Sequence, residues 1–139
     1  MNLHERDHQR PKGSSVNPRQ GARGLAIGRA AFGAALLIAP ERVAKGWLGE
    51  YSERPAVQAL VRSIGVRDLV LGMIALHTLD HPEVGPRWQA TCAVVDSVDL
   101  LATGAARKDL PAAGVAGTAL VAGGAAAAGF YFARALKQS

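Results

Sequence analysis

The segment from Leu110 to Ala133 constrains the fold more than any other feature, because it contains no Asp, Glu, Lys, Arg or His. As an α-helix it would be about 36 Å long, which is enough to cross a lipid bilayer. A surface helix of that length in a soluble bundle should carry a charged outer face. A chain of 139 residues also lacks the mass to surround such a helix on every side. The segment therefore predicts insertion into a membrane.

Three further apolar segments precede this one. The four predicted spans cover about 25–39, 55–79, 88–106 and 110–133. Consecutive apolar helices joined by short loops pack as antiparallel neighbours. The sequence therefore predicts an all-α fold, a four-helix transmembrane bundle over residues 24–136.

Residues 1–23 have a different composition from the rest of the chain. They hold five of the sixteen Lys and Arg residues and few apolar side chains. Such a segment cannot offset the entropy lost on ordering, which predicts a disordered basic N-terminal tail. The formal charge of +5 would suit a nucleic-acid-binding protein, but cations in the tail and at segment ends suit anionic lipid better. The sequence therefore predicts the lipid bilayer as the partner and predicts no binding of nucleic acid.

The distribution of cations also predicts an orientation. With four spans both termini lie on one side, where Lys and Arg number eight, against five on the other side. The positive-inside rule therefore predicts a multi-pass protein of the cell membrane with both termini in the cytoplasm. After Pro40, the apolar residues Val43, Trp47 and Leu48 share a helical face, which predicts a short amphipathic helix at the membrane interface.

Glycine residues recur on the predicted spans. Gly24-x-x-x-Gly28 opens the first span, Gly65 and Gly72 lie one heptad apart on the second, and five more glycines lie on the fourth. Small residues allow transmembrane helices to approach closely. Tight packing within the bundle is the preferred interpretation, and a Gly-rich face for a homo-oligomer or a larger membrane partner is the alternative.

Six charged residues interrupt the predicted spans: Arg29, Arg62, Arg67, Asp68, Asp96 and Asp99. Each is costly inside a bilayer unless it is paired, hydrated or able to reach the surface. Their equal numbers of cations and anions suggest mutual neutralisation. Asp96 and Asp99 are three residues apart and share a helix face. The polar stripe that they form continues through Gln89, Cys92 and Thr103. Such a stripe should face the bundle interior.

Depth along the spans predicts which of these charges meet. Arg67 and Asp68 are adjacent and point about 100° apart on a helix, so their partners should come from other helices. Counted from the short turn at 80–87, Arg67 and Asp99 lie at equal depth, which predicts a contact between them. A cluster that also includes Arg62 and Asp96 is the broader form of this prediction. Arg29 lies nearer the surface, where it could snorkel or reach Asp96.

These six residues are the candidates for binding or for a proton relay. A structural ion cluster that only fixes helix orientation is the preferred interpretation, ahead of a relay or a polar pocket for an amphipathic ligand. His77 and His81 have a spacing that can hold a metal, but Pro82 ends the helix there, so a solvated turn fits better. No cofactor and no catalytic residue is predicted, because the sequence has no Walker loop, nucleophile elbow or CxxC motif.

Three strings resemble a known family. They are Gly28-Arg29-x-x-x-Gly33 leading to Ala39-Pro40, Gly65-Val66-Arg67-Asp68-Leu69-Val70-Leu71-Gly72, and Asp96-x-x-Asp99. Across Leu25 to about Leu136 the chain resembles a family of small, uncharacterised four-span integral membrane proteins that form a domain of unknown function. It is more distantly similar to the DoxX-like four-helix membrane proteins. The resemblance implies a compact four-helix bundle and no established activity.

Together these features predict a non-enzymatic membrane protein that acts as an accessory subunit or binding module. The alternative is a small transporter or proton-coupled carrier that uses the intramembrane pair Asp96 and Asp99. A membrane enzyme acting on a lipid-like substrate is a third interpretation, for which the sequence offers no nucleophile or metal site.

Overall fold

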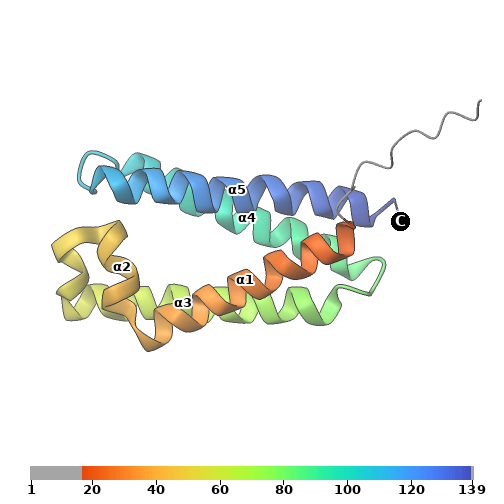
Figure 1. Ribbon diagram of the computed structural model, residues 1–139, viewed down its shortest axis with the longest axis horizontal. Helices are drawn as coiled ribbons and strands as arrows, with labels where there is room; N and C mark the ends of the chain where they lie inside the picture. Colours follow the sequence, from red (N-terminus) through yellow and green to blue (C-terminus); the bar gives the residue numbers. More distant parts are fainter. Residues whose placement is uncertain (1–16, 139) are drawn as a thin grey trace, which may run out of the picture.

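The computed structural model describes residues 17–138, and within that range its regular structure is entirely helical. The elements are α1 (Pro18–Ile38), α2 (Pro40–Leu48), the 3-10 helix η1 (Gly49–Glu53), α3 (Pro55–Thr78), α4 (Val84–Ala105) and α5 (Ala112–Leu136). The four long helices form a bundle, with α2 at one end (Figure 1). The predicted all-α class is confirmed, and each predicted span corresponds to one long helix.

Helix α1 starts earlier than the sequence prediction placed it. The side chain of Asn17 accepts a hydrogen bond from the backbone N–H of Arg19 at 3.0 Å, and Pro18 occupies the first turn. Both features favour a helix start, because the cap satisfies a free N–H and proline has none to lose. The prediction of disorder is therefore wrong for residues 18–23, whereas residues 1–16 lie outside the described part. With 21 residues, α1 is about 30 Å long and is not a short span.

Proline and glycine residues set the boundaries around α2. Pro40 begins α2, Pro55 begins α3, and Gly49 ends α2 with a φ of 59°. That left-handed conformation favours glycine because it has no Cβ. Val43 and Leu48 of α2 pack against an apolar cluster between α1 and α3. The predicted short amphipathic helix is present.

Successive long helices run in opposite directions. Arg19 at the start of α1 forms an ion pair with Asp80 in the α3–α4 turn at 3.2 Å, and α5 ends at the same end of the bundle (Figure 1). At the other end the start of α5 lies against α2, where a Cβ on Gly114 would be 2.8 Å from the Cα of Trp47. Both ends of the described chain therefore lie at one end of the bundle.

Small residues allow α1 and α3 to approach closely. A Cβ on Gly33 would lie 2.6 Å from the carbonyl oxygen of Gly65, and a Cβ on Gly72 would lie 2.7 Å from a backbone nitrogen of α1. Neither position has room for a larger residue. At Gly24 and Gly28, in contrast, a Cβ would meet nothing within 4 Å. Packing within the chain thus uses Gly33, Gly65 and Gly72, and the Gly24-x-x-x-Gly28 motif lies on an open face.

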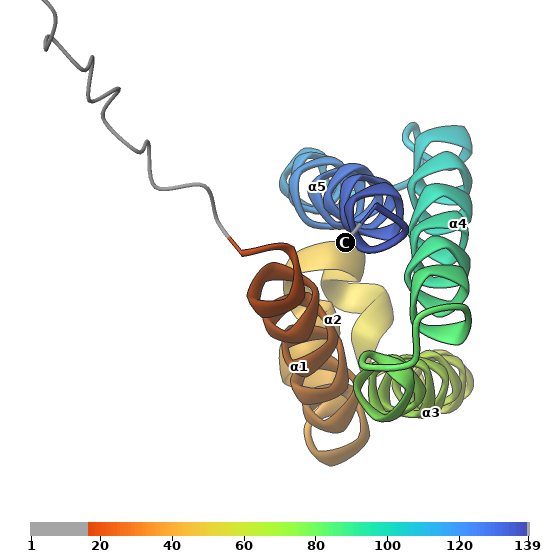
Figure 2. The same ribbon diagram turned by 90° about the vertical axis from the view of Figure 1, so that its right-hand side faces the viewer.

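The bundle consists of two closely packed helix pairs, α1 with α3 and α4 with α5 (Figure 2). In the second pair a Cβ on Gly129 would lie 2.9 Å from the Cβ of Ala93. The turn at 80–87 joins α3 to α4, as the sequence predicts, but each of these helices packs more closely on a different partner. The seam between the two pairs is where the charged residues lie.

The bundle exposes large apolar side chains and buries several polar and charged ones. Large apolar side chains are exposed along the long helices, among them Ile38, Leu60, Met73, Leu101, Leu120 and Tyr131. Buried positions include Asp68, Gln89, Asp96 and Thr103. Burial of charged groups beneath an apolar exterior is costly in water and is the arrangement expected in lipid.

Two of the described helices, α1 and α5, are long and apolar enough to cross a membrane. Helices α3 and α4 have comparable lengths of 24 and 22 residues. Both carry arginine or aspartate residues within their apolar stretches.

Candidate functional site: an interior Arg/Asp cluster

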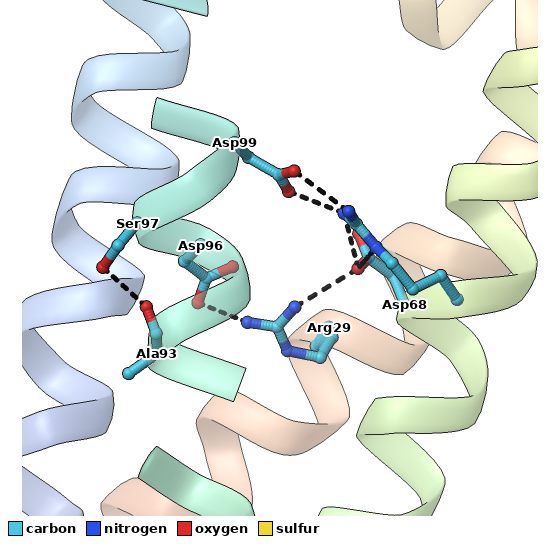
Figure 3. Close-up of polar contacts among 7 residues, drawn as sticks. Arg29, Asp68, Ala93, Asp96, Ser97 and Asp99 are labelled. Atoms are coloured by element: carbon cyan, nitrogen blue, oxygen red, sulfur yellow. Dashed lines mark hydrogen bonds and ion pairs between the residues drawn. The ribbon is translucent and has the colours of Figure 1, made fainter. Parts of the chain in front are cut away.

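Five charged side chains from three helices meet inside the bundle (Figure 3). We call them the interior cluster: Arg29 from α1, Arg67 and Asp68 from α3, and Asp96 and Asp99 from α4. Helix α5 adds no charge to it, because its sequence from Ala112 to Ala133 has no ionisable acid or base other than Tyr131, which is exposed. The cluster therefore connects the α1–α3 pair to α4 across the seam.

Arg29 lies at the centre of the interior cluster. Its Nη1 donates to Oδ1 of Asp68 at 3.2 Å, and its Nη2 donates to Oδ2 of Asp96. The Arg29 side chain is only 7% exposed, as is that of Asp68. The alternative in which Arg29 snorkels to the surface is wrong, and its predicted contact with Asp96 is confirmed. Because α1 starts at Pro18, Arg29 lies near the middle of its helix rather than near an end.

Arg67 forms a two-bond ion pair with Asp99. Its Nη1 and Nη2 donate to the two carboxylate oxygens of Asp99 at 2.9 and 2.6 Å. Both side chains are 34% exposed, so this pair lies nearer the bundle surface than Arg29 does. The predicted Arg67–Asp99 contact is confirmed. Such fork-to-carboxylate geometry is among the stronger hydrogen-bonding arrangements in proteins.

Arg67 also reaches its own neighbour. Its Nε and Nη2 lie 3.3 and 3.2 Å from Oδ1 of Asp68. The sequence prediction that these adjacent residues could not meet is wrong, because the arginine side chain is long enough to turn back toward the next residue. Oδ1 of Asp68 therefore accepts hydrogen bonds from both arginines of the cluster.

Arg62 does not belong to the interior cluster. It is exposed on α3, and none of the ion pairs found in residues 17–138 includes it. Five residues separate it from Arg67, which turns the two side chains about 140° apart on a helix. The predicted participation of Arg62 is therefore wrong. With Arg62 outside, three carboxylates face two guanidinium groups, and the expected equality of charge does not hold.

The polar stripe of α4 faces the interior, as predicted. Gln89, Cys92 and Thr103 are 1%, 3% and 3% exposed, and Asp96 is buried with them. Cys92 packs against Ala26 and other small side chains between α1, α3 and α4. The Nε2 of Gln89 and the Oγ1 of Thr103 have no hydrogen-bond partner among the described residues. The stripe therefore contains buried polar groups beyond the ion pairs.

The remaining candidates lie away from this site. His77 and His81 are exposed, and Nδ1 of His81 accepts a hydrogen bond from the backbone N–H of Val84 at 3.4 Å at the start of α4. Within residues 17–138, no three His, Cys, Asp or Glu side chains are grouped so that they could hold a metal ion. The Ser97 hydroxyl, beside the interior cluster in sequence, donates to the carbonyl of Ala93 at 2.8 Å (Figure 3).

No family model matches this chain, and neither curated proteins nor solved structures give a match. The fold and the interior cluster therefore define its class: a small helical bundle with two helices able to cross a membrane. The resemblance to the four-span family and to the DoxX-like proteins remains a prediction.

Proposed function

We propose that this chain is a four-span integral membrane protein with a non-enzymatic role, as an accessory subunit or binding module. The observation that carries this proposal is the apolar outer surface of the bundle. Large apolar side chains are exposed on all four long helices, among them Ile38, Leu60, Leu101 and Leu120. The charges within the apolar stretches of α3 and α4 are largely paired within the seam.

The interior cluster supports a binding or organising role rather than catalysis. Its guanidinium and carboxylate groups bond to one another, and the nearby Ser97 hydroxyl is bonded to the backbone. The open face with Gly24 and Gly28 would give a larger membrane partner or a second copy a place for close helix contact. The resemblance to small four-span membrane proteins agrees with the proposed four-span topology. The excess of Lys and Arg on the side of the termini supports a cytoplasmic location for both ends.

A cysteine-labelling experiment tests the four-span topology. In a Cys92→Ala background, single substitutions Glu83→Cys, Lys45→Cys and Lys137→Cys are labelled with a membrane-impermeant maleimide in sealed vesicles. Four spans place Glu83 in the α3–α4 turn on the same side as Lys137, with Lys45 on the opposite side. If only α1 and α5 crossed the membrane, Glu83 would instead be labelled together with Lys45.

Extraction at alkaline pH provides the matching control for membrane insertion. The protein should remain with the lipid, because its apolar outer surface would otherwise face water. A full-length chain that stays monomeric and folded in buffer without detergent would contradict the proposed membrane location.

The second candidate function is a small proton-coupled carrier. The observation that favours it is the unequal charge of the interior cluster, in which three carboxylates face two guanidinium groups. Proton carriers in membranes commonly use buried carboxylates of this kind. Proton-driven uptake into vesicles containing the purified chain tests this function. If the chain moves no protons under an imposed pH gradient, the carrier function is excluded and only the binding role remains.

A further inference from the structure

The excess negative charge of the interior cluster can be assigned to particular residues. Arg67 and Asp99 form a two-bond pair that is neutral as a unit, and both side chains are 34% exposed. The remaining members are Asp68, Arg29 and Asp96, with side chains 7%, 7% and 9% exposed. This trio contains two carboxylates and one guanidinium group. The unbalanced charge therefore lies in its most deeply buried part.

The described residues supply only Arg29 and Arg67 as cations to this trio, and Arg67 is shared with Asp99. The titratable or charged groups that face it are Arg29 on α1, Arg67 and Asp68 on α3, and Cys92, Asp96 and Asp99 on α4, and α5 brings none. Arg67 contributes hydrogen bonds to Asp68, but its charge is already balanced by Asp99. In the described structure, Oδ2 of Asp68 and Oδ1 of Asp96 accept no hydrogen bond. A lone negative charge in such surroundings is strongly unfavourable.

We propose that Asp68 and Asp96 share one bound proton at neutral pH, which makes this pair the proton site of the bundle. The inference rests on the proposed membrane location, and it deepens the carrier function. A proton fits where a metal ion does not, because the guanidinium of Arg29 already lies between the two carboxylates (Figure 3). The proton comes from water and binds to one free carboxylate oxygen, which leaves the trio neutral.

Two unpartnered polar groups give independent support for this site. Gln89 and Thr103 each lie one heptad from Asp96 on the same face of α4, one toward each end of the helix. They are 1% and 3% exposed, and the Nε2 and Oγ1 atoms lack partners in the described part of the chain. Buried groups in this state commonly bind water. Water bonded to them would extend the polar face of α4 from Asp96 toward both ends of the helix.

Infrared difference spectroscopy of the full chain in lipid vesicles tests the proposal, because a protonated carboxyl has a carbonyl band that a carboxylate lacks. At neutral pH the wild type should show one protonated carboxyl per chain. Asp96→Asn should show none, because one guanidinium then matches one carboxylate in the trio. Arg29→Gln should show two, because both carboxylates lose their cation. Asp80→Asn, an exposed acid in the α3–α4 turn, is the matched control and should retain one.

Stability gives a second measurement that does not depend on Arg29→Gln folding. Asparagine resembles a protonated aspartate but needs no proton, so Asp96→Asn should be at least as stable as the wild type at neutral pH. The wild type should lose stability as the pH rises above the range in which free carboxyl groups titrate, because the unfolded chain then releases a proton that the folded bundle still holds, whereas Asp96→Asn should lose much less. The inference would be overturned if the wild type showed no protonated carboxyl. It would also be overturned if sodium or potassium ions stabilised the wild type but did not stabilise Asp96→Asn. If Glu83→Cys labelling still supports four spans, the membrane proposal survives that failure.

Discussion

Replacement of Arg29 by glutamine should destabilise the bundle far more than any other single arginine substitution. The side chain is 7% exposed and binds one carboxylate on α3 and another on α4. Removal of one partner from a buried ion pair typically costs about 3–5 kcal/mol, because the other charge remains buried without compensation. We expect a loss in that range for Arg29→Gln at neutral pH. The loss should shrink as the pH falls, because the folded Arg29→Gln variant binds one proton more at Asp68 and Asp96 than the wild type does, and a lower pH favours the state that binds more protons.

Two other arginines provide a graded comparison. Arg67→Gln should lower the free energy of unfolding by about 1–2 kcal/mol. Hydrogen bonds to charged groups contribute slightly more than this, but solvent screens the Arg67–Asp99 pair because both side chains are 34% exposed. Arg62→Gln should change stability by no more than about 0.5 kcal/mol, because Arg62 is exposed and makes no ion pair within residues 17–138. The expected order of cost is therefore Arg29, then Arg67, then Arg62.

The single cysteine of the chain provides the assay. Cys92 is 3% exposed and packs beside the interior cluster, so a thiol reagent should modify it only when the bundle opens. Unfolding in mixed micelles with increasing denaturing detergent can be followed by its labelling rate and by circular dichroism. Equal losses for Arg29→Gln and Arg62→Gln would show that burial of Arg29 does not determine its contribution, and would refute the reasoning.

Three further predictions use the same unfolding measurement. Gly33→Ala should destabilise the bundle by about 1–3 kcal/mol, because its Cβ would lie 2.6 Å from a backbone oxygen of α3, whereas Gly28→Ala on the open face of α1 should not; equal effects would contradict the packing described. In a double-mutant cycle, Arg67→Gln and Asp99→Asn should show a coupling of about 0.5–3 kcal/mol, and additive losses would mean that their ion pair contributes nothing. Asn17→Ala should cost about 0.5–2 kcal/mol and increase hydrogen exchange in the first turn of α1, and unchanged exchange would rule out its role as a cap.

The sequence predicted the helices well because its apolar segments are clearly separated by loops. It also predicted the Arg67–Asp99 pair, since residues at equal distance from a short turn meet across antiparallel helices. The inward orientation of Asp96 followed from helical spacing alone, because the polar residues of α4 recur on one face. These predictions depend on distance along a helix, which the sequence specifies directly.

The roles of Arg29 and Arg62 could not be separated from the sequence, because they depend on how each helix is rotated. Rotation follows from which small residues pack, and the sequence offers glycines on more than one face of α1. The structure shows that Gly33 and Gly72 make the close approach. Arg29 then faces the seam and Arg62 faces outward. Asn17 followed by Pro18 was the local signal that could have placed Arg29 near the middle of its helix.

Two kinds of contact hold this bundle together, one within the helix pairs and one between them. Within each helix pair, close packing of small residues fixes the contact, and one ion pair, Arg29–Asp68, also joins α1 to α3. Between the pairs, the principal polar contacts are those of Asp96 and Asp99 with the two arginines of the interior cluster. A change of charge there would weaken the seam and leave both pairs intact. The carboxyl pair with unbalanced charge thus lies at the one interface where the gain or loss of a proton could open the bundle without unfolding it.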